Sequence, residues 1–347
     1  MRGLLLGVGM VCSCFSPDAR DGLPCSAAGD CPPGQSCQVG ICSSEVLPDA
    51  SRLDAATSDA GPSPPGDFGG PMLIALNCPG PVLCTDVRDP FMNADGNSLV
   101  FTALVATPAG NYDIDYAVRL GDTTFGTAAS IGAINTTLAE HSAFLSADGN
   151  QLWFARQDIS SGTGVEPYDQ ILFSKRDTGL FDSASGVDGG VDTLRGDERS
   201  PQVSADGTAM LFTRSTEPAL MDHDVYLARL ESGQWNTIER IDGLSMEDAN
   251  ERSIALVEDR KAFFYIRDEH IHEALWTGDD PTRIAVDVLH DELDADPLDT
   301  KVGVWASPDG SEIWFDSNRG AGAQQIYRAV RDAPTPSGGR IRRTPIR

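Results

Sequence analysis

A pair of polar, mostly charged positions recurs along this chain, eight and seven residues before each of a series of regularly spaced aspartates. The first position is acidic in three copies and the second is basic in four. The residues concerned are Arg88, Glu140, His141, Glu198, Arg199, Glu251, Arg252 and Lys301. If the fold brings them into one small volume, they could bind a polar ligand or supply a general acid and base.

Three interpretations of this set stay open. The charges could form an ion-pair lattice that orients neighbouring structural units, or they could converge on a polar ligand. They could also catalyse hydrolysis, with Glu198 and Glu251 as acid and base, because two carboxyls roughly 5 to 10 Å apart suit glycoside cleavage. The sequence does not show which side chains lie close together, so no catalytic residue is assigned.

Other chemistry-bearing motifs are weaker. His270 and His272 alternate in "HIHE" without a nearby third ligand, and the acidic run 291–299 lacks the spacing of an EF-hand. No G-x-S-x-G elbow, Walker motif or Rossmann glycine pattern occurs. We therefore expect no metal and no cofactor, and a peptidase is disfavoured.

The elements that must position these residues are repeats. The stretch "SPQVSADGTAMLF" (200–212) has counterparts at 89–101, 142–154, 253–265 and 303–315. Each joins an apolar strand to a turn and then to a strand ending in an aromatic residue. An Asp-Gly turn between apolar runs predicts a β-hairpin, because glycine tolerates positive φ. The repeat of about 50 residues is typical of propellers or solenoids.

A third strand follows in every unit, and a weaker fourth is predicted at 127–134, 189–194, 235–241 and 282–289. Four antiparallel strands per unit indicate propeller blades. The fifth unit lacks its fourth strand, while the apolar stretch 71–77 precedes the first hairpin. The sequence therefore predicts an all-β propeller of five blades, closed by this N-terminal strand in the last blade. Six blades is the alternative.

The segment "SPDGSEIWFDSNRGAGAQQIYRAVR" (307–331) resembles the TolB-type, WD-repeat-like β-propeller repeat, which has Ser-Pro-Asp-Gly, an aromatic strand, Ser-x-Arg-Gly and Ile-Tyr. The resemblance extends to the copies at 89, 142 and 200 and to "DHDVYLARL" (222–230). It implies a propeller in which the turn aspartates are structural, and it leaves the activity open. The copy at 253 departs with Arg260 in place of glycine, so a different turn is expected there.

Composition narrows the possible partners. The chain of 347 residues carries 26 Lys and Arg against 52 Asp and Glu, a net charge of -26. Such a surface repels phosphate backbones and anionic lipids, so nucleic acid is a poor candidate partner.

The N-terminus indicates export. One positive charge and a short apolar run precede "VCSC" (11–14), which resembles a lipobox. We expect a signal peptide over 1–13, with Cys14 as the lipidated first mature residue, although an ordinary signal peptide is the alternative. The other mature cysteines are even in number and favour disulfides over zinc. They are Cys25, Cys31, Cys37, Cys42, Cys78 and Cys84.

The expected organisation is a Cys-rich segment (14–42), a flexible linker (43–70), a propeller (71–331) and a disordered basic tail (332–347). The favoured function is a non-enzymatic binding scaffold in the periplasm or at the cell surface, anchored to the outer membrane by lipid. Its partner would be an envelope protein, peptide or glycan, and the protein itself is expected to be a monomer. The alternative is a hydrolase or lyase acting on a polysaccharide or small substrate at the channel mouth.

Overall fold

The computed structural model describes most of residues 66–331 and three short strands nearer the N-terminus. Within 66–331 it leaves out 79–81, 106–110, 159–167, 177–178, 194–195, 217–221, 247–248, 295–298 and 320–321. The signal, Cys14, the side chains of the other predicted disulfide cysteines except Cys78, most of the linker and the tail lie outside the described residues. Cys78 is disulfide-bonded.

The chain divides into two compact units, Met1–Asp59 and Ala60–Arg347. In the first, strands β1 (Leu23–Pro24), β2 (Ser36–Gln38) and β3 (Ile41–Ser43) form an antiparallel sheet in the order β1-β3-β2.

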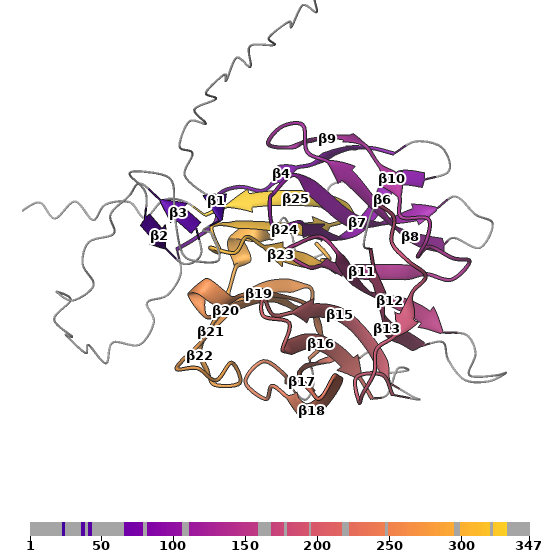
Figure 1. The fold of residues 1–347 in the computed structure, drawn as a ribbon. Helices are drawn as coiled ribbons and strands as arrows, with labels where there is room; N and C mark the ends of the chain where they lie inside the picture. The colour runs from indigo at the N-terminus through magenta and orange to yellow at the C-terminus, as the bar shows by residue number, and fades with distance from the viewer. Residues whose placement is uncertain are drawn as a thin grey trace, which may run out of the picture. The chain divides into compact units, whose positions relative to one another are not determined.

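The second unit is a five-bladed β-propeller, as the sequence predicts. Five four-stranded antiparallel sheets follow one another round a ring (Figure 1). From the inner strand outward, blade 1 is β6 (Val82–Met92), β7 (Ser98–Val105), β8 (Asn111–Val118) and β10 (Ala129–Ser130); blade 2 is β11 (Glu140–Leu145), β12 (Gln151–Asp158), β13 (Tyr168–Lys175) and β14 (Ser185–Gly186); blade 3 is β15 (Asp197–Val203), β16 (Ala209–Ser215), β17 (Asp224–Glu231) and β18 (Gln234–Arg240); blade 4 is β19 (Glu251–Val257), β20 (Ala262–Arg267), β21 (His270–Trp276) and β22 (Ile284–Leu289); and blade 5 is β23 (Val304–Ala306), β24 (Glu312–Ser317), β25 (Gln325–Val330) and β4 (Met72–Leu73).

The predicted ring closure is confirmed. Strand β4 pairs with β25, placing Leu73 opposite Tyr327, and Ile74 N donates to Ile326 O at 2.9 Å. The contact begins earlier than expected, because Phe68, which the sequence places in the linker, bridges to Arg331 and is buried. A parallel pair, β5 (Ala75–Asn77) with β9 (Thr124–Thr127), continues the contact onto blade 1.

The hairpin turns follow the predicted chemistry. In blade 3, Asp206 accepts hydrogen bonds from the Ser204 hydroxyl and from Thr208, while Gly207 takes φ of 71°. Blade 4 differs as expected: a 3₁₀ turn over Glu258–Arg260 ends at Lys261, which takes φ of 53° in place of glycine. The outer strand of blade 2 also differs, since it forms at Ser185–Gly186 rather than over 189–194.

Large apolar side chains fill the spaces between the blades. The aromatic residue that ends each second-strand motif is fully buried, namely Phe101, Phe154, Phe212, Tyr265 and Phe315. This packing fixes the inner strands, whose side chains line the central channel.

Candidate functional site

The inner strands of blades 1 to 4 share a kink that decides which residues reach the channel. The pairing register slips after Arg88, His141, Arg199 and Arg252. The residue after each takes positive φ: 48° at Asp89, 55° at Ser142, 53° at Ser200 and 42° at Ser253. These are β-bulges with a left-handed residue, a conformation that costs non-glycine residues energy and re-aims the neighbouring side chains.

The residue before each kink faces the channel. Arg88, His141, Arg199 and Arg252 all line one cavity of about 200 Å³, together with Val302 from blade 5. We call this cavity the polar mouth. Below it, Asp89, Ser142, Ser200 and Ser253 line a constriction of about 20 Å³. The basic half of the predicted set therefore converges on the axis.

The glutamates of the predicted set do not line this cavity. Glu140, Glu198 and Glu251 are fully buried within their blades. Each faces an arginine of the second strand: Arg156 at 2.7 Å, Arg214 at 3.0 Å and Arg267 at 3.0 Å. Successive residues of a strand point to opposite faces, so a glutamate cannot share the direction of the basic residue beside it.

The arginine partners explain why these glutamates are buried. Arg156, Arg214 and Arg267 also donate to the carbonyls of Ile134, Val191 and Leu244, which belong to the connections between blades. The pairs therefore tie each inter-blade connection to the following blade. Acid and base roles for Glu198 and Glu251 at the channel mouth do not fit this geometry.

The last predicted residue, Lys301, is also buried rather than at the mouth. Its ammonium lies 2.5 Å from Asp294 and 3.3 Å from Asp299. Arg319 binds Asp299 and the Leu293 carbonyl, so blade 5 makes the same kind of connection with different residues.

Acidic side chains that the sequence did not single out complete the polar mouth. Asp169 lies 3.0 Å from His141 and 2.6 Å from Arg199, and Asp197 lies 2.9 Å from Arg199. His223 approaches Asp197 at 3.3 Å. Asp169 begins the third strand of blade 2, and its alternation with buried apolar residues was the one signal that could have pointed to it.

These contacts set the charge state of the mouth. Burial opposes charge on His141, but the Asp169 carboxylate outweighs it and raises the pKa of the imidazole. Burial likewise works against ionised Asp197, yet His223 and Arg199 lower the pKa of this carboxyl. At the rim, Arg88 forms a bidentate pair with Asp86 and lies over the Tyr112 ring.

Arg252 is the exception within the mouth. Among the described residues, no side chain or backbone group forms a hydrogen bond or ion pair with its guanidinium. Burial and the charge of Arg199 lower the pKa of Arg252. An anionic group in the mouth would offset this repulsion, so Arg252 is the site's strongest candidate for ligand contact.

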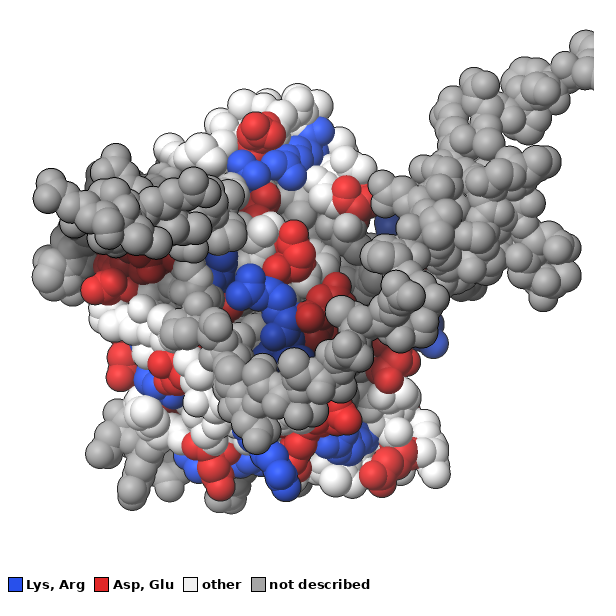
Figure 2. All heavy atoms as spheres, turned by 90° about the vertical axis from the view of Figure 1, so that its left-hand side faces the viewer, with Lys and Arg blue, Asp and Glu red and all other residues white. Residues whose placement is uncertain are grey.

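The remaining charged motifs are accounted for locally. His270 pairs with Asp294 and His272 with Asp287, on different partners. No group of three potential metal ligands occurs within the described ranges, and none of the described helices is long and apolar enough to cross a membrane. In Figure 2, basic side chains gather in small groups with acidic ones beside them.

No protein family and no curated protein sequence matches the chain. Solved structures with a similar fold include a proposed TolB from Agrobacterium tumefaciens, at 14% identity and a TM-score of 0.40, covering 73% of this chain and 92% of that one. An α-L-arabinofuranosidase from Podospora anserina in complex with cellotriose gives 11%, 0.45, 78% and 97% for the same measures. The catalytic domain of a GH62 α-L-arabinofuranosidase from Coprinopsis cinerea gives 8%, 0.46, 77% and 96%. At such identities the likeness concerns the fold alone.

Proposed function

We propose that this protein is an exported, lipid-anchored β-propeller that acts as a non-enzymatic binding scaffold in the cell envelope. Its partner is an envelope protein, peptide or glycan that presents an anionic group to the polar mouth. The observation that carries the proposal is the guanidinium of Arg252, which lines the mouth beside Arg199 without an acidic partner among the described residues.

The test is affinity capture from envelope extracts on immobilised protein. Wild type should retain a reproducible partner, and Arg252→Gln should weaken that binding about tenfold, because charge-assisted contacts to a carboxylate or phosphate contribute about 1.5 to 3 kcal/mol. Arg283→Gln is the matched control, since Arg283 also belongs to blade 4 but is exposed and lines none of the mouth.

Two results would count against this function. Failure to recover any reproducible partner would remove the support for a scaffold, and equal retention by Arg252→Gln would exclude the mouth as the contact. The anchor is tested separately, because Cys14→Ser should release the protein from the membrane fraction.

A hydrolase is the second candidate, and one observation favours it. His141 bridges the Asp169 carboxylate at 3.0 Å and the Ser142 hydroxyl at 3.0 Å, and all three line the polar mouth. Such a series of acid, imidazole and hydroxyl is the arrangement that activates a nucleophile. Turnover of aryl glycosides or esters that Ser142→Ala abolishes would support hydrolysis; absence of turnover across both substrate classes would reject it.

A further inference from the structure

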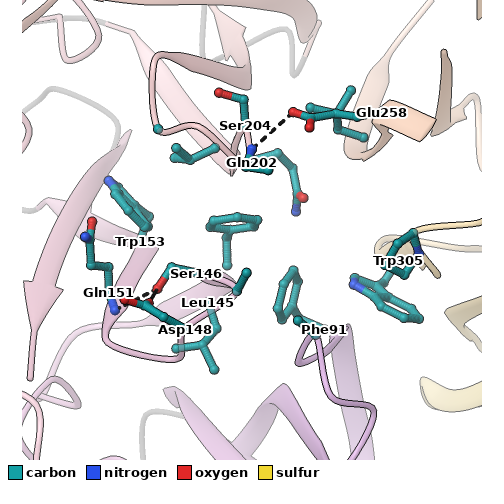
Figure 3. A pocket seen from close by; sticks show the side chains of 18 of the residues that line it. Phe91, Leu145, Ser146, Asp148, Gln151, Trp153, Gln202, Ser204, Glu258 and Trp305 are labelled. Atoms are coloured by element: carbon teal, nitrogen blue, oxygen red, sulfur yellow. Dashed lines mark hydrogen bonds between the residues drawn. The ribbon is translucent and has the colours of Figure 1, made fainter. Parts of the chain in front are cut away.

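A second cavity opens at the other end of the inner strands, beside the hairpin turns. It measures about 550 Å³ and is lined by residues from all five blades. Figure 3 shows Phe91, Trp153 and Trp305 around it. Phe91 meets Trp305 with ring centroids 6.3 Å apart and Phe144 at 5.1 Å, so aromatic rings form a continuous wall. We call this cavity the turn-side pocket.

The rim of the turn-side pocket is acidic. Asp148, Asp206, Glu258 and Asp259 line it, and no Lys or Arg is among its lining residues in the described part of the chain. Hydrogen bonds from Ser146 and Asn150 lower the pKa of Asp148, and those from Ser204 and Thr208 lower the pKa of Asp206. The rim therefore stays negatively charged at neutral pH.

The wall also carries polar groups without partners. The Gln202 amide and the Trp305 indole N–H form no hydrogen bond within the described residues, and both side chains border the open space in Figure 3. Aromatic faces beside carboxylates suit a guanidinium on an aliphatic stem, which stacks on rings and pairs with carboxylates. The free amide and indole suit peptide groups of the same ligand.

A segment of this chain with that chemistry starts beside the pocket. Arg331, the last described residue, donates from its backbone N to Ser311 O at 2.7 Å and from Nε to Gly310 O at 3.2 Å. Pro308 of the same turn lines the pocket. Sixteen residues follow, 332–347, with four arginines and one acidic residue. At ~3.3 Å per residue they can span roughly 50 Å, enough to reach any point of the cavity.

We propose that the turn-side pocket binds the arginine-bearing C-terminal segment 332–347 of the same chain. The arginines of this segment are Arg340, Arg342, Arg343 and Arg347, interspersed with Ile341 and Ile346. Their charge complements the rim, and the isoleucines match the aromatic wall. Covalent connection gives the segment a high effective concentration at the pocket, so weak individual contacts suffice. This site is independent of any partner at the polar mouth.

The experiment measures how fast trypsin cleaves full-length protein after Arg342 and Arg343, by mass spectrometry at low salt. Docking should protect these bonds in wild type. The pocket variant Glu258→Gln with Asp259→Asn should be cleaved about fivefold faster, because two rim charges are lost. The control Asp122→Asn with Asp242→Asn removes two exposed charges outside the pocket and should leave the rate unchanged. Equal rates in wild type and pocket variant would overturn the proposal.

A second measurement keeps the occupant identified. A synthetic peptide of residues 332–347 is titrated against wild type and against a chain with Arg340, Arg342, Arg343 and Arg347 all replaced by Gln. The peptide should bind the replaced chain at least fivefold more tightly, since its own segment no longer competes. Binding to neither protein, or equal binding to both, would contradict occupation of the pocket by this segment.

Discussion

At the scale of single residues, the repeated Glu-Arg pairs are structural. Glu198 and Arg214 lie opposite each other in the sheet, as do Glu140 with Arg156 and Glu251 with Arg267. Blade 1 has Val87 and Ala103 at the corresponding positions, opposite each other and buried. A blade can therefore be built with either an ion pair or apolar residues at this point, as is known for buried ion pairs generally.

Removing one partner should cost far more than removing both. Glu198→Ala leaves the Arg214 guanidinium buried without its carboxylate, so we expect the free energy of unfolding to fall by about 3 kcal/mol. The double variant Glu198→Ala with Arg214→Ala should be less destabilised than the two single variants added together. Urea denaturation of the four proteins measures this difference, and strict additivity would show that the pair is not coupled.

Asp115 is a buried acid of a different kind. It is 1% exposed, and neither carboxylate oxygen has a hydrogen-bond partner among the described residues. Burial, and then the charge of Asp113, raise the pKa of Asp115 to about 6. Because this pKa lies above the ordinary value near 3.8, the contribution of Asp115 to stability is present below pH 4 and is lost as the pH rises towards 6.

The variant Asp115→Asn should remove that loss. Relative to wild type, its free energy of unfolding should increase by on the order of 2 kcal/mol between pH 4 and pH 6, and the difference should stay constant above pH 6. Chemical denaturation at a series of pH values measures it. A difference independent of pH would mean that Asp115 titrates normally in the folded protein.

At the scale of elements, the kinked inner strand governs both the channel and the contact between first and last blades. Blade 5 has Gly303 where the other blades have Asp89, Ser142, Ser200 and Ser253. A Cβ on Gly303 would lie 2.5 Å from Asp89 Cα and 2.8 Å from Asp89 N. Asp89 N and Gly303 N also donate to the same Asp316 oxygen, at 2.9 and 2.8 Å. The backbones of blades 1 and 5 approach this closely only because the residue is glycine.

Gly303→Ala should therefore loosen the junction of these blades and lower the unfolding free energy by about 3 kcal/mol, since neither backbone can yield easily. Gly132→Ala is the control, because an added Cβ there meets nothing within 4 Å. Thermal unfolding compares the two. Similar midpoints for both variants would show that the junction relaxes at little cost.

The sequence predicts the strands better than it predicts the site. Apolar alternation and Asp-Gly turns are local signals, and they place the three long strands of each blade. The direction of Glu198 relative to Arg199 depends on the kink at Ser200, which serine does not announce. The counter-ions Asp169 and Asp197 reach the mouth from two different blades, so only the assembled ring brings them together.

At the scale of the whole molecule, a short N-terminal stretch holds the ring closed. Phe68 packs on Phe264 of blade 4 with centroids 5.9 Å apart, and the Arg331 guanidinium lies 4.4 Å from its ring. Its backbone N donates to Glu292 at 3.1 Å. One side chain thus joins the segment before the first blade to both of the last two blades.

Phe68→Ala should lower the unfolding free energy by about 3 kcal/mol, the usual cost of truncating a buried phenylalanine. Hydrogen exchange should speed up in β25 more than in β15, because opening β4 frees the edge of blade 5 first. Met72→Ala, at an exposed position of β4, serves as control. Uniform acceleration across all blades would show that closure and global unfolding are one event.

The pairing of Leu73 with Tyr327 also has a consequence for biosynthesis. A ribosome makes β4 before every complete blade and β25 after nearly all of them, so β4 has no partner for most of translation. Until then both strand edges are open to pairing with other chains, which is a hazard for aggregation. The nascent protein thus needs its last blade before its first strand is safe, and holdase chaperones that cover open edges should matter most during that interval.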